Sequence, residues 1–178
     1  MKDTKHYKSM INLFFKTLLL VSLGAMLNAC QVSLSGSSIP PDVKTISITN
    51  LTNESGSMPA QLGQQLAESF RNYYLQNTSL KIVPSGGDYQ LTGRVVGYEQ
   101  SGVAPTSDGK AASNRLTIKL SMTFVNTKND KESFKDQVFS QFCDFEQTKS
   151  LSQEEANMIL CITPKLEQDL FNKTVANW

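Results

Sequence analysis

The chain has 178 residues and balanced charge, with 17 lysines and arginines against 16 aspartates and glutamates. A formal net charge of +1 lacks the basic surplus of a nucleic-acid-binding protein, so no nucleic-acid partner is expected. The single histidine, His6, lies in the N-terminal segment, and Ser–His–Asp and Cys–His catalysis are therefore excluded for the folded domain. We expect no enzymatic activity, no metal and no cofactor.

The first 29 residues resemble a bacterial lipoprotein signal peptide. Four lysines precede the apolar run Leu18–Leu27, and Asn28 and Ala29 then precede Cys30. A basic region, a short apolar region and a small residue before the cleavage site are typical of such signals. The apolar run has half of the roughly 20 residues that a membrane-spanning helix needs. We therefore expect cleavage after residue 29 and acylation of Cys30; the alternative is a soluble secreted protein in which Cys30 is merely the first cysteine.

Cleavage would leave 149 residues, with 13 basic and 15 acidic side chains, because it removes four lysines and Asp3. The net charge of this mature chain is −2. Residues 30–41 are small, polar and end in two prolines, which is typical of a tether. Residues 42–178 are enough for a single domain with its own core.

The first half of this domain predicts a strand, a helix and a short strand. Val43–Thr49 is rich in β-branched residues, and its isoleucines alternate, as in a strand. From Met58 to about Gln76, apolar side chains recur every four residues and predict an amphipathic helix. The recurring side chains are Leu62, Leu66, Phe70 and Tyr74. Leu80–Val83 predicts a second, short strand.

Three further strands are predicted in the second half. Tyr89–Tyr98 alternates, and Leu116–Phe124 has the clearest period of two in the chain, so one of its faces must be buried. Phe134–Phe145 returns as a third strand that is apolar on both faces. The polar loops Ser101–Lys110 and Asn126–Lys131 connect these strands.

A second helix follows, beginning with the capping box Ser152–Glu155. Glu154 and Glu155 complement the helix dipole there, which explains this carboxylate pair without catalysis. Pro164 predicts a kink or a break into two shorter helices. The order of elements predicts an α+β fold, with two helices packed on one face of a four- to five-stranded mixed sheet and the other face open.

Cys143 and Cys161 are predicted on the last strand and the last helix. In an oxidising compartment they would form a disulfide that ties the helix to the sheet. Two buried free cysteines that pack as small apolar side chains are the alternative.

Three basic residues, Arg94, Arg115 and Lys119, fall at strand positions on the polar side. If they meet on the open face, they would form a positive patch suited to the phosphate or sugar-acid groups of a lipid. Ordinary solvation of a sheet face is the alternative.

The mature chain also resembles a known family through three segments, Ser35–Ile48, Asn114–Ile118 and Phe171–Trp178. It is similar to LptE, the lipopolysaccharide-assembly lipoprotein, in the form found in Bacteroidetes-type bacteria. The resemblance implies a lipid-anchored protein on the periplasmic side of the outer membrane that plugs the LptD β-barrel and helps deliver lipopolysaccharide to the cell surface. It also implies two helices on a sheet of four or slightly more strands.

A barrel lumen is polar, so the two polar loops suit a plug. Direct binding of lipopolysaccharide by Arg94, Arg115 and Lys119 remains a physical hypothesis, because no family motif covers them. The alternative function is a periplasm-facing lipoprotein that acts as adaptor or activator of another envelope complex. A carrier with an apolar lipid pocket is a third possibility, for which an alternating sheet under two helices leaves little room.

Overall fold

The computed structural model of the chain describes residues 39–56, 58–105 and 112–175. The predicted signal peptide, Cys30 and most of the predicted tether lie outside the described residues. Across the described part, no helix combines the length and the hydropathy that a membrane span requires.

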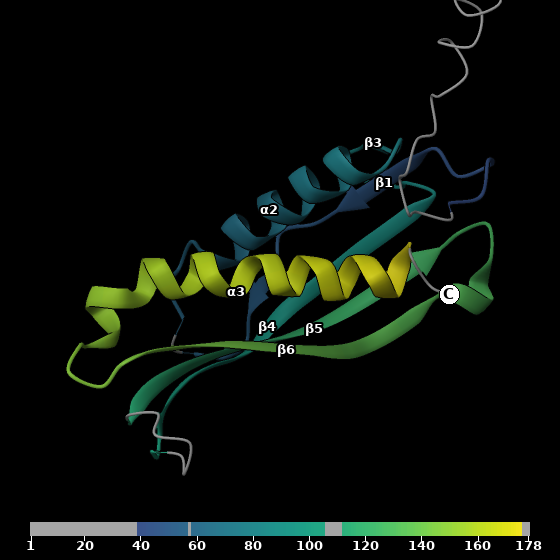
Figure 1. The fold of residues 1–178 in the computed structure, drawn as a ribbon. Helices are drawn as coiled ribbons and strands as arrows, with labels where there is room; N and C mark the ends of the chain where they lie inside the picture. The colour runs from purple at the N-terminus through teal and green to yellow at the C-terminus, as the bar shows by residue number, and fades with distance from the viewer. Residues whose placement is uncertain (1–38, 57, 106–111, 176–178) are drawn as a thin grey trace, which may run out of the picture. The chain divides into compact units, whose positions relative to one another are not determined.

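The domain is a mixed six-stranded sheet with two helices on one face (Figure 1). The strands are β1 Thr45–Ile48, β2 Thr52–Asn53, β3 Lys81–Ile82, β4 Tyr89–Val103, β5 Ser113–Asn126 and β6 Phe134–Glu146. The helices are α2 Leu62–Asn77 and α3 Leu151–Thr174, with a 3-10 turn, η2, at Asp130–Glu132. The predicted α+β fold is confirmed, with one strand more than expected.

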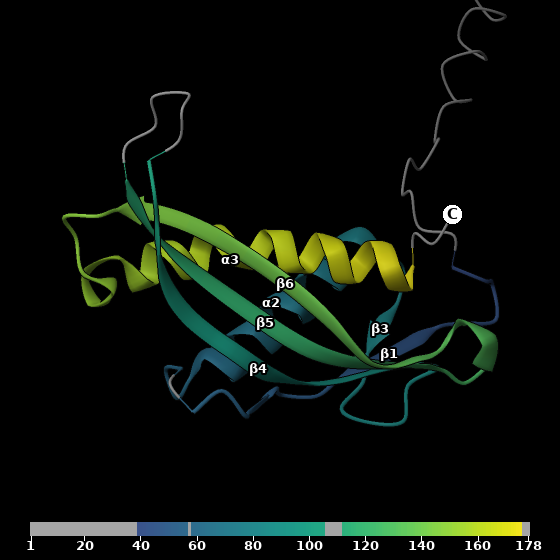
Figure 2. The same cartoon turned by 90° about the horizontal axis from the view of Figure 1, so that it is seen from below.

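The strand order is β3-β1-β4-β5-β6, and β2 pairs with β4 outside this path. β1 runs parallel to β3 and β4, whereas β4, β5 and β6 form an antiparallel meander. Viewed from below, the three long strands lie in front of α2 and α3, and nothing in the described chain covers them (Figure 2). We call this uncovered side of β4, β5 and β6 the open face.

The core lies between the sheet and the helices. The alternating apolar side chains of β5 are at most 1% exposed, as the period of two predicts. They meet the predicted apolar stripe of α2 and the buried side chains of α3. These residues are Leu116, Ile118, Leu120, Met122 and Phe124 on β5, Leu62, Leu66, Phe70 and Tyr74 on α2, and Ile162, Leu166 and Leu170 on α3.

Of the kink or break predicted at Pro164, the break is wrong, because α3 continues through this residue. Pro164 has no N–H to donate to the carbonyl of Leu160, one turn earlier. Both residues are exposed, and Leu160 is 72% exposed, so water can bond to that carbonyl. Ile162 and Leu166 meanwhile hold the opposite side of the helix in the core.

The candidate open face of the sheet

Side chains that alternate with the core residues of β5 point to the open face, together with their partners on β4 and β6. The pairing places Arg94 opposite Ser121, and Lys119 opposite Gly97 and Ser140. Arg115 pairs with Ser101 and Asp144. All three basic residues therefore lie on one face, an arrangement that the sequence analysis gave only as a condition.

Arg94 bridges two acidic residues from different elements. Its Nη2 lies 3.0 Å from Asp136 Oδ1, and its Nε lies 3.0 Å from Glu54 Oε2 but is not aligned for a hydrogen bond. Asp136 has φ 52°, next to the register shift between Met122 and Phe124. This left-handed conformation at an irregular strand position accompanies the contact between Asp136 and Arg94.

Arg115 makes a two-pronged ion pair with its cross-strand partner. Its Nε lies 2.7 Å from Asp144 Oδ1 and its Nη2 lies 3.0 Å from Oδ2. These hydrogen bonds raise the pKa of Arg115 above its ordinary value. The guanidinium also stacks on Phe142, with Cζ 3.6 Å from the ring centroid, so it has a fixed orientation on the open face.

Lys119 pairs with Glu99 of β4, at 3.1 Å between Nζ and Oε2. Each of the three cations is thus paired with at least one carboxylate. The open face therefore carries ion pairs, with three cations and four carboxylates, in place of the uniformly positive patch that the basic residues alone indicated. Exposed apolar side chains lie between them, including Val138 at 54% and Phe142 at 41%. Such a face can contact a partner that is itself polar with scattered apolar groups.

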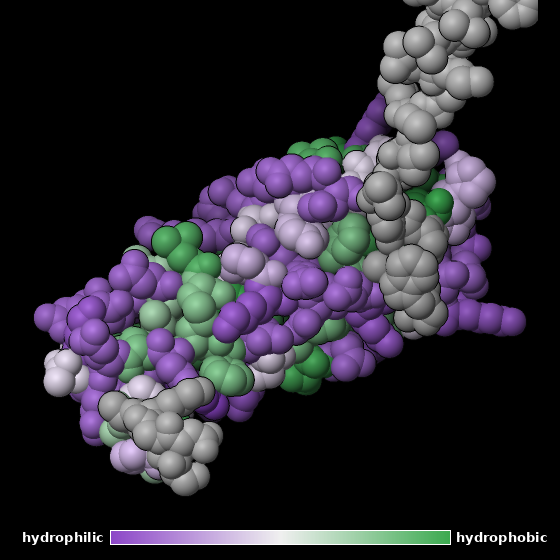
Figure 3. Space-filling view, viewed as in Figure 1, coloured by the Kyte–Doolittle hydropathy of each residue, from purple (hydrophilic) through white to green (hydrophobic). Residues whose placement is uncertain are grey.

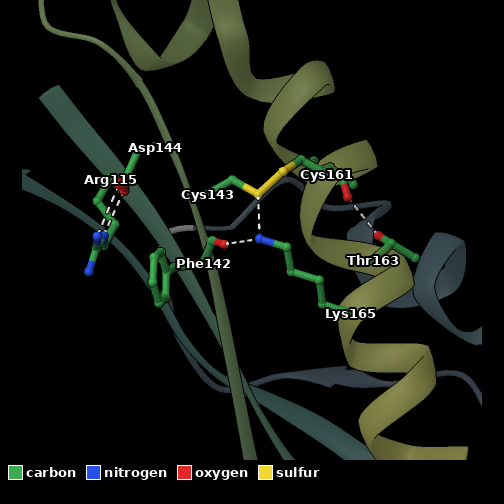
Figure 4. Close-up of a disulfide and its surroundings, with 8 residues drawn as sticks. Arg115, Phe142, Cys143, Asp144, Cys161, Thr163 and Lys165 are labelled. Carbon is green, nitrogen blue, oxygen red and sulfur yellow. Dashed lines mark hydrogen bonds and ion pairs between the residues drawn. A yellow bond between two sulfur atoms is a disulfide. The ribbon is translucent and has the colours of Figure 1, made fainter. Parts of the chain in front are cut away.

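Cys143 of β6 and Cys161 of α3 are joined by a disulfide (Figure 4). Cys143 is buried, at 4% exposed, whereas Cys161 is exposed. Lys165, one turn after Cys161, donates to the backbone carbonyl of Phe142 at 2.8 Å and contacts Cys143 Sγ at 3.2 Å. The edge strand β6 is therefore tied to α3 by a covalent bond and by a lysine.

A groove on the helix side was not foreseen from the sequence. It lies between α2 and α3, has a volume of about 510 Å³, and is lined by Pro59, Gln61, Gln65, Ser69, Glu155, Ala156, Ile159, Leu160 and Thr163. Figure 3 shows the hydrophobic side chains that gather along this part of the two helices. The signal available in the sequence was Leu160, because this leucine lies outside the apolar stripe of the predicted amphipathic helix. In the structure it is exposed. The groove is open to the surface and is lined by polar as well as apolar side chains, unlike an enclosed lipid pocket.

The geometry defines the described part of the chain as a small two-layer α+β domain, with one sheet face that no described segment covers. Within the described ranges, no three His, Cys, Asp or Glu side chains are grouped so as to hold a metal ion. The family model LptE, described as lipopolysaccharide-assembly, matches residues 43–174, and the chain belongs to this family. No curated protein sequence matches the chain.

The chain is similar to several solved structures at low sequence identity. A Xanthomonas campestris protein has 9% identity and a TM-score of 0.50, with 76% of this chain and 88% of that one covered. A minor lipoprotein from Acinetobacter baumannii has 17% identity and a TM-score of 0.47, with 76% and 94% covered. The rare lipoprotein B from Shewanella oneidensis has 15% identity and a TM-score of 0.42, with 73% and 90% covered.

Proposed function

We propose that this LptE-family protein is anchored through an acylated Cys30 to the periplasmic side of the outer membrane and fills the lumen of an LptD-like β-barrel. Its role is structural: it supports the barrel while lipopolysaccharide passes to the cell surface. Membership of a lipopolysaccharide-assembly family supports this role. The identity of the partner as a barrel and the lipid anchor at Cys30 are inferred from the sequence and from the shape of the domain.

The observation that carries the proposal is the open face. A sheet face that the described part of its own chain leaves open is normally solvated or covered by a partner. Here it combines ion pairs with exposed Val138 and Phe142, and a barrel lumen is lined by polar side chains. Because Arg115 and Lys119 are already paired with carboxylates, close contact with a polar lumen would not leave these cations buried without a partner.

The length of the strands supports the same assignment. β5 has 14 residues and pairs along its length with both β4 and β6. At about 3.4 Å per residue such a strand extends roughly 45 Å, longer than the ~25 Å apolar band of an outer-membrane barrel. The meander is therefore long enough to reach through a lumen.

We further propose that Arg94, Arg115 and Lys119 are the side chains that meet lipopolysaccharide phosphates on this face. Each phosphate would compete with a carboxylate already in place, such as Asp144 at Arg115 or Glu99 at Lys119. Binding by exchange of ion pairs weakens as salt screens the charges. We therefore expect weak binding of lipopolysaccharide by the isolated protein, which declines with ionic strength.

The test is purification of the lipidated chain from its own membranes in mild detergent, with identification of the proteins that accompany it. We expect a near-stoichiometric outer-membrane barrel. The variant Ser140→Trp places a bulky ring on the exposed open face and should reduce barrel recovery at least tenfold. The matched control, Gln168→Trp on the exposed side of α3, should leave it unchanged.

Equal barrel recovery with both variants would contradict the open face as the contact surface. An envelope enzyme or a secretion complex in place of the barrel would instead establish the adaptor function and contradict the plug.

A further inference from the structure

The two cysteines of the disulfide differ in their exposure to solvent. Cys161 lies on the exposed side of α3, whereas Cys143 is only 4% exposed and lies on β6 beneath the helix. A thiolate attacks a disulfide sulfur along the S–S axis and needs access to that sulfur. Access therefore favours attack at Cys161 and departure of Cys143.

Lys165 favours the same direction of cleavage. Its Nζ lies 3.2 Å from Cys143 Sγ, and the side chain is held in place by its hydrogen bond to the Phe142 carbonyl at 2.8 Å. Figure 4 shows this ammonium approaching the Cys143 side of the S–S bond. A neighbouring ammonium stabilises a thiolate, and a more stable thiolate leaves faster.

We propose that Cys161 is the site at which external thiols exchange with this disulfide, and that Cys143, next to Lys165, is the leaving and resolving sulfur. In reduction, a thiolate forms a new S–S bond with Cys161 Sγ, and the electron pair of the broken bond goes to Cys143 as a thiolate. A second external thiolate then attacks the external sulfur of this mixed disulfide, which frees Cys161 as a thiolate and releases the external disulfide.

Oxidation is the reverse reaction. The Cys161 thiolate attacks an external disulfide and expels one external thiolate. The Cys143 thiolate then attacks Cys161 Sγ, forms the intramolecular bond and expels the second. The external partner is a thiol or its disulfide, either a small molecule or a Cys-X-X-Cys oxidoreductase. This site is independent of the proposed barrel function.

The test uses the full chain purified in mild detergent. The oxidised protein is exposed to limiting reduced glutathione, quenched with acid, and the position of the mixed disulfide is found by peptide mass spectrometry. A second arm uses a Cys-X-X-Cys oxidoreductase whose resolving cysteine is replaced by alanine. We expect at least tenfold more mixed disulfide at Cys161 than at Cys143, and the arm that gives it identifies the class of thiol.

The rate of reduction by glutathione tests Lys165. The variant Lys165→Met should slow the reaction about three- to tenfold, because the leaving thiolate loses its counter-charge. Lys165→Arg should stay within about twofold of the wild type, and the control Lys173→Met, on the last turn of α3, should react like the wild type. The position of the mixed disulfide is determined on the wild-type protein, so this measurement does not depend on the folding of any variant. Mixed disulfide mainly at Cys143, or equally at both cysteines in both arms, would overturn the proposal.

Discussion

Asp88 shows at the scale of one residue how the start of β4 is fixed against β1. Its Oδ2 accepts hydrogen bonds from the backbone N–H groups of Lys44 and Thr45 and from the Thr45 hydroxyl, and its Oδ1 pairs with Lys128. The hydrogen bond from Lys44 is the largest cause that lowers the pKa of this carboxyl well below its ordinary value. The ionised form is therefore the one that the fold stabilises.

This arrangement predicts an acid-sensitive contribution to stability. A group whose pKa is lower in the folded state contributes fully above its unfolded pKa, about 3.9 for Asp, and loses the contribution as the pH falls below that value. We expect Asp88→Asn to reduce the free energy of unfolding at pH 7 and to flatten its decline between pH 5 and pH 2. Denaturant titrations at several pH values measure this. Asp130→Asn, an exposed carboxylate on η2, is the control, and an equal effect of both variants would rule out the special role of Asp88.

Gly87 lies one residue earlier, where the backbone of β1 comes too close for any side chain. A Cβ at this position would lie 2.7 Å from both Ser47 N and Tyr89 O, and backbone atoms cannot move aside. We expect Gly87→Ala to lower the free energy of unfolding by about 1–3 kcal/mol, as overpacking does. Gly102→Ala is the control, because a Cβ there meets nothing within 4 Å. Thermal unfolding of both variants tests this prediction. Similar melting temperatures for the two would contradict the predicted crowding at Gly87.

At the scale of elements, local pattern was enough for β5 and α2 but not for the C-terminal end of β4. The alternation in Leu116–Phe124 is visible in the sequence because each second side chain is buried. Ser101–Val103 lacks such alternation, and is a strand only because it pairs with Ser113–Arg115 of β5. Pairing between distant segments leaves no local signal, so these residues were expected in a loop.

The same reason limits prediction of the open face. Alternation placed Arg115 and Lys119 on the polar side, but the net charge of the surface around them depends on carboxylates from other strands. Asp144 reaches Arg115 through the register of β5 and β6, and Asp136 reaches Arg94 near an irregularity in that register. Neither partner follows from sequence spacing.

The disulfide that joins β6 to α3 should contribute to the stability of the domain. The disulfide closes a loop with a sequence separation of 18, and cross-links of this size stabilise by about 3 kcal/mol, chiefly by restricting the unfolded chain. We expect the double variant Cys143→Ala, Cys161→Ala to lose about 2–4 kcal/mol of unfolding free energy and remain folded. Reduced wild type is the matched control and should lose a similar amount. Unchanged stability on reduction, or two free thiols in the untreated protein, would contradict the structural disulfide.

At the scale of the whole molecule, the two faces of the sheet differ in the roles that we assign to them. The helix side holds the core, whereas the open face carries the paired charges that the proposed function assigns to a polar partner. Substitutions on the open face should therefore impair assembly more than folding, and core substitutions the reverse. This separation makes the open face suitable for mutational tests of function.

Also at the scale of the whole molecule, the proposed lipid anchor leads to a prediction about Cys30. One acyl chain binds a membrane only reversibly, whereas several chains, at about 0.8 kcal/mol per buried CH₂, hold a protein there. We expect the wild type to incorporate labelled palmitate and Cys30→Ala to incorporate none. Cys161→Ala is the control and should label like the wild type. Fractionation alone is not decisive, since a barrel partner would retain the unacylated chain in the membrane. Label that persists in Cys30→Ala would contradict the lipoprotein signal, whereas its loss together with continued barrel recovery would show that anchor and docking act separately.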